Sequence, residues 1–214
     1  MLDEAGFTDA IISASSDLDE NLINSLKTQG AAIKSWGVGT NMITSSDWPA
    51  FGGVYKLVAL KDEATGQFIP KIKLSENSEK VTNPGNKTVY RIYGIDTGKM
   101  IADLIALTDE EYSASQPLLL FDPVDTWKKT HLAPGTYTIR ELPVQVFDNG
   151  QCVYESPSVM EIRDYCQQEL DTLWDEAKRL INPHRAHIYL SAKLYATKNS
   201  LLEAVDNMTH QQNL

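Results

Sequence analysis

The sequence predicts an α/β protein with a short βαβ unit first, a strand-rich section next and helices at the end. Two strand patterns enclose a helix pattern within the first 40 residues. Apolar segments separated by turn residues fill the middle of the chain, and apolar residues recur at helical spacing near its end. We therefore divide the chain into three sections, residues 1–60, 61–155 and 156–214.

The first section begins with a predicted strand at Asp9–Ser15, DAIISAS. The residues that follow, SSDLDE, have the chemistry of a helix start, because Ser16 or Asp17 can cap the helix. An acidic residue three positions later, Asp19 or Glu20, completes a capping box. The helix presents one apolar face through residues spaced four apart, Leu18, Leu22 and Leu26.

A second strand follows this helix closely. Gly30 stands where a glycine often ends a helix, and Ile33–Trp36 is the next strand, which leads into two glycines. A strand, a helix and a strand this close together predict a parallel pair with a right-handed crossover. That unit is the building block of α/β sheets and barrels.

The middle section carries strand patterns and hairpin chemistry. Pro84 and Gly85 occupy the positions that a type II turn favours. This turn would join two of the predicted strands into a hairpin. The predicted strands are Val54–Leu60, Lys71–Ser75, Thr88–Tyr93, Met100–Leu107 and Tyr137–Phe147.

Helices are predicted for the last section. Ser156 can cap a helix with Pro157 at its first position, and Pro183 ends the pattern. Ser191 caps a final helix that continues through Leu194, Leu201 and Val205. The first of these helices has a single apolar stripe over about six turns, made of Val159, Ile162, Cys166, Leu170, Leu173, Ala177 and Leu180.

Composition excludes several classes of protein. The chain has 214 residues, 42% of them hydrophobic and 22% charged, which is ordinary for a soluble domain. A net charge of −10 argues against nucleic-acid binding, which needs a basic footprint. Two cysteines, Cys152 and Cys166, are too few for a disulfide framework. We expect a cytoplasmic protein without a signal peptide or a membrane span, because no apolar run is long enough.

Polar and glycine residues follow both strands of the predicted parallel pair. Ser15, Ser16 and Asp17 end the first strand, and the second ends in Gly37, Val38, Gly39 and Thr40. Ligands of α/β proteins bind beyond the carboxyl ends of the strands, and glycines let backbone N–H groups approach a phosphate closely. One interpretation is a phosphate cradle with a threonine hydroxyl. The other is a plain turn with helix-capping serines, in which Asp17 is also only a cap.

Several segments, taken in order, resemble a known family. SSDLDE, WGVGT and KIKLSENSEKVTNPGNK are followed by RELPVQVFDNG, PSVMEIRDY, RLINPH and LSAKL. Together they resemble the C-terminal half of a bacterial nicotinate phosphoribosyltransferase over nearly the whole chain. Such enzymes join nicotinate to the phosphoribosyl group of 5-phosphoribosyl 1-pyrophosphate (PRPP), release pyrophosphate and couple the reaction to hydrolysis of ATP, with Mg²⁺.

The resemblance implies a fold and a set of site residues. The chain would contain the end of an irregular α/β (TIM-like) barrel in residues 1–60, then the β-rich section and the C-terminal helices. Thr40 would be the main PRPP contact, and the homodimer or a partner with the N-terminal half would complete the enzyme. The residues implied to bind substrate phosphate are Ser15, Ser16, Asp17, Gly37, Val38, Gly39 and Thr40.

The sequence departs from the family pattern at several points. Relatives often have Gly or Asn where this chain has Ser16, and usually Tyr and Asp where it has Ala186 and Tyr189. The family's phosphorylated histidine aligns with no histidine here, and its Arg-x-Asp-Ser-Gly-Asp element is not found. No catalytic residue is therefore assigned to this chain. The alternative function is that of an inactive or split fragment that acts only as a binding or dimerisation module.

Other charged residues allow a functional and a structural interpretation. His184 and His187 lie three apart, but no third ligand follows them, so we expect no metal site. Lys56 and Arg91 lie within strand patterns and are expected to pair with internal carboxylates. A predicted basic hairpin either attracts an anionic substrate or is a solvated surface. It comprises Lys71, Lys73, Lys80 and Lys87.

Overall fold

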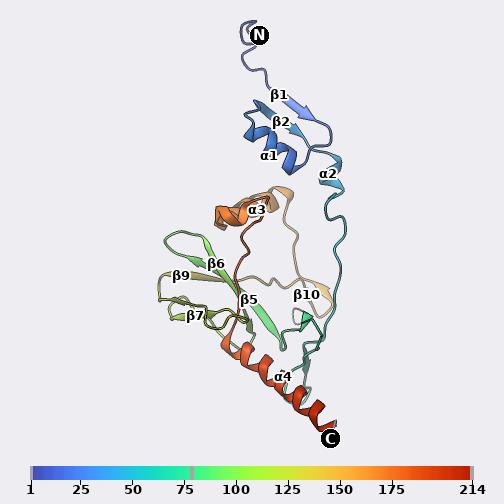
Figure 1. Ribbon diagram of the computed structural model, residues 1–214, viewed down its shortest axis with the longest axis vertical. Coiled ribbons are helices and arrows are strands. Elements are labelled where there is room, and N and C mark those ends of the chain that lie inside the picture. Colours follow the sequence, from blue (N-terminus) through green and yellow to red (C-terminus); the bar gives the residue numbers. More distant parts are fainter. Residues whose placement is uncertain (1, 78–79, 213–214) are drawn as a thin grey trace. The chain divides into compact units, whose positions relative to one another are not determined.

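The computed structural model describes residues 2–77 and 80–212, with no description of side chains from 208 onward (Figure 1). Contacts divide the chain into two compact units, residues 1–54 and 55–214. The predicted section boundaries at 60 and 155 stay a prediction. Within the described residues, no helix is long and apolar enough to cross a membrane.

The first unit contains the predicted βαβ arrangement. Strand β1 (Ile12–Ser15) pairs in parallel with β2 (Ile33–Gly37), and helix α1 (Glu20–Thr28) connects them. The short helix α2 (Thr40–Ile43) follows β2. The sequence therefore predicted both strands and their parallel pairing, although β1 begins three residues later than Asp9.

The two ends of α1 show which local signals were decisive. Gly30 has a φ of +80°, and its N–H donates to the Lys27 carbonyl, as in a Schellman cap. The predicted N-terminal caps are wrong, because Asp19 is the capping residue and accepts a 2.7 Å hydrogen bond from the Leu22 N–H. Ser16 and Asp17 lie outside the helix in a left-handed backbone conformation.

The second unit is built on a four-stranded sheet with the order β12-β6-β5-β9 (Figure 1). Its strands are β5 (Lys87–Gly94), β6 (Met100–Leu107), β9 (Tyr137–Glu141) and β12 (Ile188–Leu190). Only β12 runs parallel to its neighbour. Three two-stranded pairs accompany the sheet: β3–β4 (Ala59–Lys61, Phe68–Pro70), β7–β8 (Leu118–Phe121, Lys129–Leu132) and β10–β11 (Phe147–Asp148, Gln151–Cys152).

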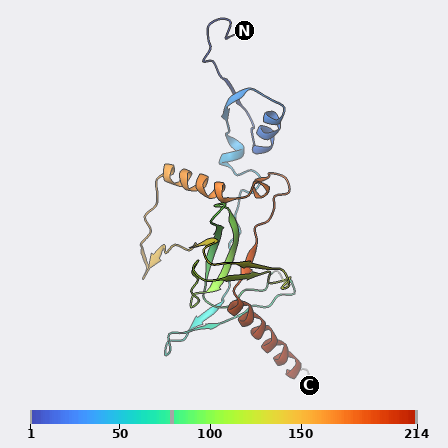
Figure 2. The ribbon, with the colours of Figure 1, turned by 90° about the vertical axis from the view of Figure 1, so that its left-hand side faces the viewer.

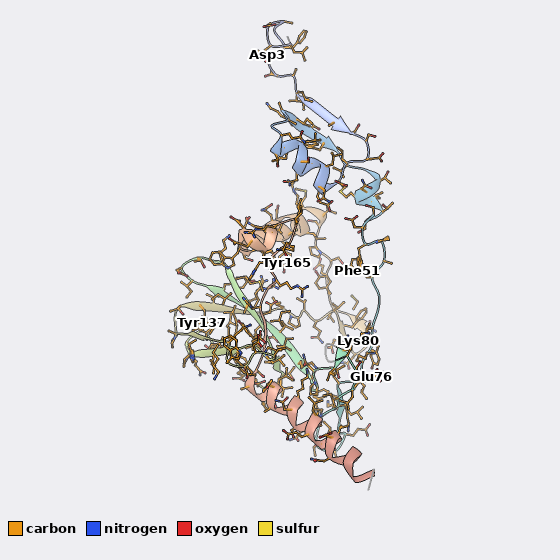
Figure 3. The ribbon with its side chains drawn as sticks, in the orientation of Figure 1. Asp3, Phe51, Glu76, Lys80, Tyr137 and Tyr165 are labelled. Atoms are coloured by element: carbon orange, nitrogen blue, oxygen red, sulfur yellow. The ribbon has the colours of Figure 1, made fainter. Side chains whose placement is uncertain are left out.

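The core lies on one face of this sheet, under the β7–β8 hairpin. Alternate residues of β6 are buried, which is the period-2 pattern of a strand with one covered face. Tyr137 lies among the strands (Figure 3), and its single O–H is shared between the carbonyls of Ser113 and Gln116, both 2.9 Å from the hydroxyl oxygen. The core cluster consists of Ile92, Ala102, Leu104, Leu118, Leu120, Tyr137 and Tyr189.

Two predicted strands of the middle section are largely wrong. Of Val54–Leu60, only the last two residues enter β3, and Lys71–Ser75 forms no strand. The backbone of the second segment bonds elsewhere, since the Lys71 N–H donates to Val58 and the Lys73 N–H donates to the Thr82 hydroxyl. The predicted hairpin is therefore absent from the described residues. Its turn glycine, Gly85, does have the expected positive φ of +88°.

The remaining strand predictions hold better. β6 has the predicted bounds, and β5 extends the predicted Thr88–Tyr93 by one residue at each end. The long Tyr137–Phe147 segment divides instead into β9 and β10. Pro143 follows the end of β9, and proline cannot donate to a strand ladder.

Of the two predicted capping residues of the C-terminal helices, one is wrong and one is confirmed. Helix α3 (Val159–Thr172) is capped by Ser158 with a capping box to Glu161, so the prediction of Ser156 is wrong. The final helix, α4 (Ala192–Gln212), begins after Ser191 as predicted. The Ser191 hydroxyl accepts from the Leu194 N–H and donates to the Glu110 carboxylate at 2.6 Å. α4 extends away from the sheet from this point (Figures 1 and 2).

The predicted six-turn stripe does not form one continuous helix. α3 ends at Thr172, and a 3₁₀ helix spans Asp175–Lys178. No residue of α3 is buried, and Val159 is 80% exposed. The helix meets the sheet through polar side chains rather than through its apolar stripe.

Candidate functional site

The ends of β1 and β2 lie next to each other. Ser15 pairs directly with Gly37, and a Cβ on Gly37 would stand 3.1 Å from the Ser15 Cβ. Any side chain at position 37 would therefore push the two strand ends apart. The glycine permits the close approach, and the polar residues after each strand emerge from one edge of the sheet, as the sequence predicted.

The loop after β1 has an unusual backbone. Ser16 has a φ of +83° and Asp17 a φ of +46°, both in the left-handed region that favours glycine. Each non-glycine residue in that region costs about 1 kcal/mol or more. Glycine or asparagine at position 16 would suit this conformation better than serine does. Both side chains are exposed and bond to no other described residue, and the same holds for the Ser15 hydroxyl.

The turn after β2 presents several free donors. The N–H groups of Gly39, Thr40 and Asn41 donate to no acceptor in the described residues. Thr40 is exposed, and its hydroxyl likewise has no partner there, while Val38 is half-buried. A Cβ on Gly39 would meet nothing within 4 Å, so space is open beside this turn.

Asn41 brings the two loops together. Its side-chain amide donates to the carbonyls of Asp17 at 3.1 Å and Leu18 at 3.3 Å. Leu18 is itself buried, with 4% of its surface exposed. No sequence pattern singled out Asn41, because the contact spans 24 positions and depends on the pairing of β1 with β2. This contact was therefore not predicted from the sequence.

A cavity of about 430 Å³ adjoins this site within the first unit. Its lining combines the start of α1 with the segment after β2. Asn41 and Leu18 contribute to it, and Trp48 is 68% exposed at its wall. The lining residues are Leu18, Asp19, Glu20, Ile23, Val38, Asn41, Met42, Ser45, Ser46, Asp47 and Trp48.

The other candidate groups do not form a site. His184 and His187 have ring centroids 5.8 Å apart, and no group of three potential ligands in the described residues can hold a metal ion. The basic hairpin does not form in the part of the chain that the structure describes, and Lys87 instead donates to the Gly85 carbonyl. Burial lowers the pKa of the Lys87 ammonium. The predicted pairing of Lys56 is wrong, because Lys56 is exposed outside any strand and pairs with no carboxylate among the described residues.

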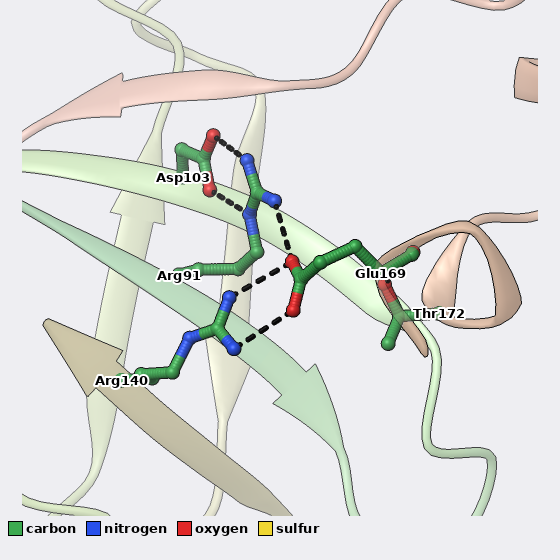
Figure 4. Close-up of polar contacts among 5 residues, drawn as sticks. All are labelled: Arg91, Asp103, Arg140, Glu169 and Thr172. Atoms are coloured by element: carbon green, nitrogen blue, oxygen red, sulfur yellow. Dashed lines mark hydrogen bonds and ion pairs between the residues drawn. The ribbon is translucent and has the colours of Figure 1, made fainter. Parts of the chain in front are cut away.

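Arg91 pairs with internal carboxylates, as predicted. Its guanidinium donates to both carboxylate oxygens of Asp103 at 2.8 and 2.9 Å, and to Glu169 at 3.3 Å (Figure 4). Arg140 donates to both oxygens of Glu169 at 2.8 Å. We refer to Arg91, Asp103, Arg140 and Glu169 as the charge cluster. It joins α3 to the sheet and has the character of a structural contact.

Replacing Ser16 with glycine is expected to stabilise the first unit by about 0.5–1 kcal/mol, because glycine adopts a φ of +83° without strain. Unfolding followed by the fluorescence of Trp36 and Trp48 would measure this. The matched control is Ser13→Gly in β1, where glycine should destabilise by about the same amount. Equal destabilisation by both changes would contradict the prediction.

The chain is similar to known proteins over nearly its whole length. Residues 86–198 match the family model described as nicotinate phosphoribosyltransferase C-terminal domain. The chain is 41% identical over 212 residues to the nicotinate phosphoribosyltransferase of Bacillus subtilis (strain 168), covering 99% of this chain and 42% of that protein. It is 32% identical over 197 residues to nicotinate phosphoribosyltransferase of Homo sapiens, covering 89% and 34%.

A solved structure is also similar. The crystal structure of human nicotinic acid phosphoribosyltransferase matches with a TM-score of 0.64 and 26% sequence identity. The match covers 94% of this chain and 36% of that chain. The chain therefore spans between 34% and 42% of the length of these relatives.

Proposed function

Because this chain belongs to the nicotinate phosphoribosyltransferase family, we propose that its two strand ends hold the 5′-phosphate of PRPP. The reaction joins nicotinate to the phosphoribosyl group, forms nicotinate mononucleotide and releases pyrophosphate. The observation that carries the proposal is the meeting of two donor-rich loops at one edge of β1 and β2.

The chemistry of these loops suits a phosphate dianion. Backbone N–H groups at Gly39, Thr40 and Asn41 have no protein acceptor in the described residues, and a hydroxyl at Thr40 adds a further donor. Hydrogen bonds to a charged oxygen are about twice as strong as neutral ones. Ser15, Ser16, Gly37 and Val38 complete the proposed set. The missing Cβ at Gly37 keeps the two loops close.

The role of this site is to position rather than to perform the bond change. The pyridine nitrogen of nicotinate attacks the anomeric carbon as the bond to pyrophosphate breaks. Holding the remote 5′-phosphate fixes the ribose relative to the nitrogen, which lowers the entropic part of the barrier. No side chain of this chain is assigned to acid, base or nucleophilic catalysis.

ATP coupling and Mg²⁺ are proposed from family membership. Asp17 is exposed and bonds to no other described residue, which fits a cation that arrives with substrate phosphates and uses one or two protein carboxylates. Mg²⁺ bound there would neutralise charge on PRPP. Asp17 would otherwise accept a hydrogen bond from a ribose hydroxyl.

The wider assembly is also a proposal. We infer that β1 and β2 belong to the C-terminal part of an irregular α/β barrel, which the parallel pairing supports. A homodimer, or a partner carrying the N-terminal part of the family, would cover apolar side chains that this chain leaves exposed. Val159 on α3 and Phe51 in the first unit, 80% and 91% exposed, support such coverage.

The test is an enzyme assay of the protein expressed from its complete gene. We expect nicotinate mononucleotide to form from nicotinate and PRPP, faster with ATP and Mg²⁺, with stoichiometric pyrophosphate. Nicotinamide and quinolinate, offered in place of nicotinate, should give little product. Calorimetric titration with Mg²⁺ and PRPP accompanies the assay. Binding without turnover would favour the binding-module alternative, and neither binding nor turnover would overturn the proposal.

A further inference from the structure

We propose that Asn41 is a positioning residue that holds the loop after β1 and the turn after β2 in one arrangement for a substrate phosphate. This inference rests on the proposed function of the strand ends. The side chain of Asn41 is the described link between residues 16–18 and residues 39–41, and it lies half-buried between them.

The geometry uses the full donor capacity of the side chain. The amide nitrogen of Asn41 donates to the Asp17 carbonyl at 3.1 Å and to the Leu18 carbonyl at 3.3 Å. A side-chain amide has two N–H donors, so both are engaged. Fixing two successive carbonyls also fixes two peptide planes, because each peptide unit is rigid. The orientation of the Leu18 and Asp19 N–H groups follows from this contact.

The loop needs such support because its backbone is strained. Ser16 and Asp17 have φ values of +83° and +46°, which non-glycine residues adopt only when the surroundings impose them. Strand pairing at Ser15 and the Asp19 cap hold the two ends of this loop, and the buried Leu18 side chain and the Asn41 amide hold its middle. Without the amide, the loop is expected to relax toward ordinary backbone angles. The N–H groups of the turn after β2 would then lie beside a loop that adopts several conformations, and the two would no longer form one fixed arrangement.

Asn41→Asp is the sharpest variant because it keeps size and shape. Its carboxylate has no donor, and it would stand where the amide nitrogen contacts two carbonyl oxygens. Repulsion from these oxygens raises the pKa of the introduced carboxyl group. On protonation at lower pH it regains one donor and loses its charge. The defect of Asn41→Asp should therefore shrink as the pH falls from 8 toward 5, whereas that of Asn41→Ala should stay constant relative to the parent protein.

The experiment measures KM for PRPP and KM for nicotinate separately in the protein as its own gene encodes it. We expect Asn41→Ala to raise the KM for PRPP about tenfold or more, as the loss of two hydrogen bonds implies. The KM for nicotinate should change less than about twofold, because the contact orders only the phosphate loops. Hydrogen exchange of a peptide covering residues 12–22 should become faster in both variants.

The control is Asn24→Ala on α1, an asparagine whose side chain makes no bond to another described residue. It should leave both KM values unchanged. An unchanged KM for PRPP in Asn41→Ala, or an equal rise for both substrates, would overturn the inference while leaving the proposed function intact. If the parent protein neither binds nor turns over PRPP, the proposed function fails instead. In that case hydrogen exchange alone tests the contact between Asn41 and the loop after β1. An unchanged exchange rate of residues 12–22 in Asn41→Asp would refute that contact.

Discussion

Replacing Glu169 with alanine is expected to lower the free energy of unfolding by about 2–3 kcal/mol, because it leaves two partly buried arginines without their shared carboxylate. Arg91 and Arg140 stand directly opposite each other on β5 and β9. Like charges in directly opposed positions destabilise a sheet. Glu169 accepts from both guanidinium groups and offsets this repulsion (Figure 4).

The measurement is denaturant unfolding followed by tryptophan fluorescence. Trp127 and Trp174 report on the second unit when Trp36 and Trp48 are replaced by phenylalanine in every variant compared. The matched control is Asp164→Ala, which removes an exposed carboxylate of α3 that pairs with no other described residue. It should change stability by less than about 0.5 kcal/mol. A Glu169→Ala effect as small as that of the control would refute the prediction.

The same contact predicts a dependence on pH. Hydrogen bonds from Arg140, with the charges of both arginines, hold the pKa of the Glu169 carboxyl below its ordinary value of 4.5. A folded-state pKa below the unfolded value means that the stabilisation is complete above pH 4.5 and is lost as the pH falls through the folded-state pKa. The stability difference between the parent and Glu169→Gln should therefore be largest at pH 7 and shrink below pH 4.5. A difference that grows in acid would contradict this assignment.

Replacing Thr40 with valine is expected to raise the KM for PRPP about 10- to 100-fold, as the loss of a hydrogen bond to a charged group implies. Valine keeps the shape and the β-branch of threonine and removes only the hydroxyl. Thr40 is exposed and its hydroxyl bonds to no other described residue, so the fold should not respond. The free energy of unfolding should change by less than about 0.5 kcal/mol.

Two controls show whether the effect comes from the Thr40 hydroxyl. Thr40→Ser keeps the hydroxyl and should stay within about threefold of the parent protein, since serine offers the same donor. The KM for nicotinate should be nearly constant in both variants. If Thr40→Val and Thr40→Ser raise the KM for PRPP equally, packing of the methyl group would explain the effect, and the hydroxyl would have no role.

Signals that lie within a few residues of one another predicted much of the local structure. The alternation of Met100–Leu107 placed β6 with its observed bounds, and Ser191 began α4 where a capping residue was expected. Gly30 ended α1 in a left-handed conformation that glycine adopts readily. The pairing of β1 with β2 followed from the short connection between them. These features depend on backbone preference and on periodic burial, which a local sequence expresses.

Where several neighbouring residues could serve the same structural role, the sequence did not show which of them does. SSDLDE contains several residues able to cap a helix, and the loop conformation at Ser16 and Asp17 left Asp19 as the cap. Similarly, Lys71–Ser75 has strand-like composition, yet its N–H groups bond to Val58 and Thr82. A residue's chemistry shows that it can serve in a role, and its position in the fold determines whether it does.

The sequence alone predicted the α/β class, strands β1, β2, β5 and β6, the start of α4 and the polar residues at the two strand ends. The three-dimensional arrangement determined which distant groups meet there. Asn41 contacts the Asp17 carbonyl across 24 positions, and Glu169 contacts Arg91 across 78. Such contacts have no periodic signature, because they depend on how separate elements pack. Backbone preferences act over one or two turns. The Asn41 contact within the first unit and the charge cluster within the second unit each exist only once their own elements are assembled.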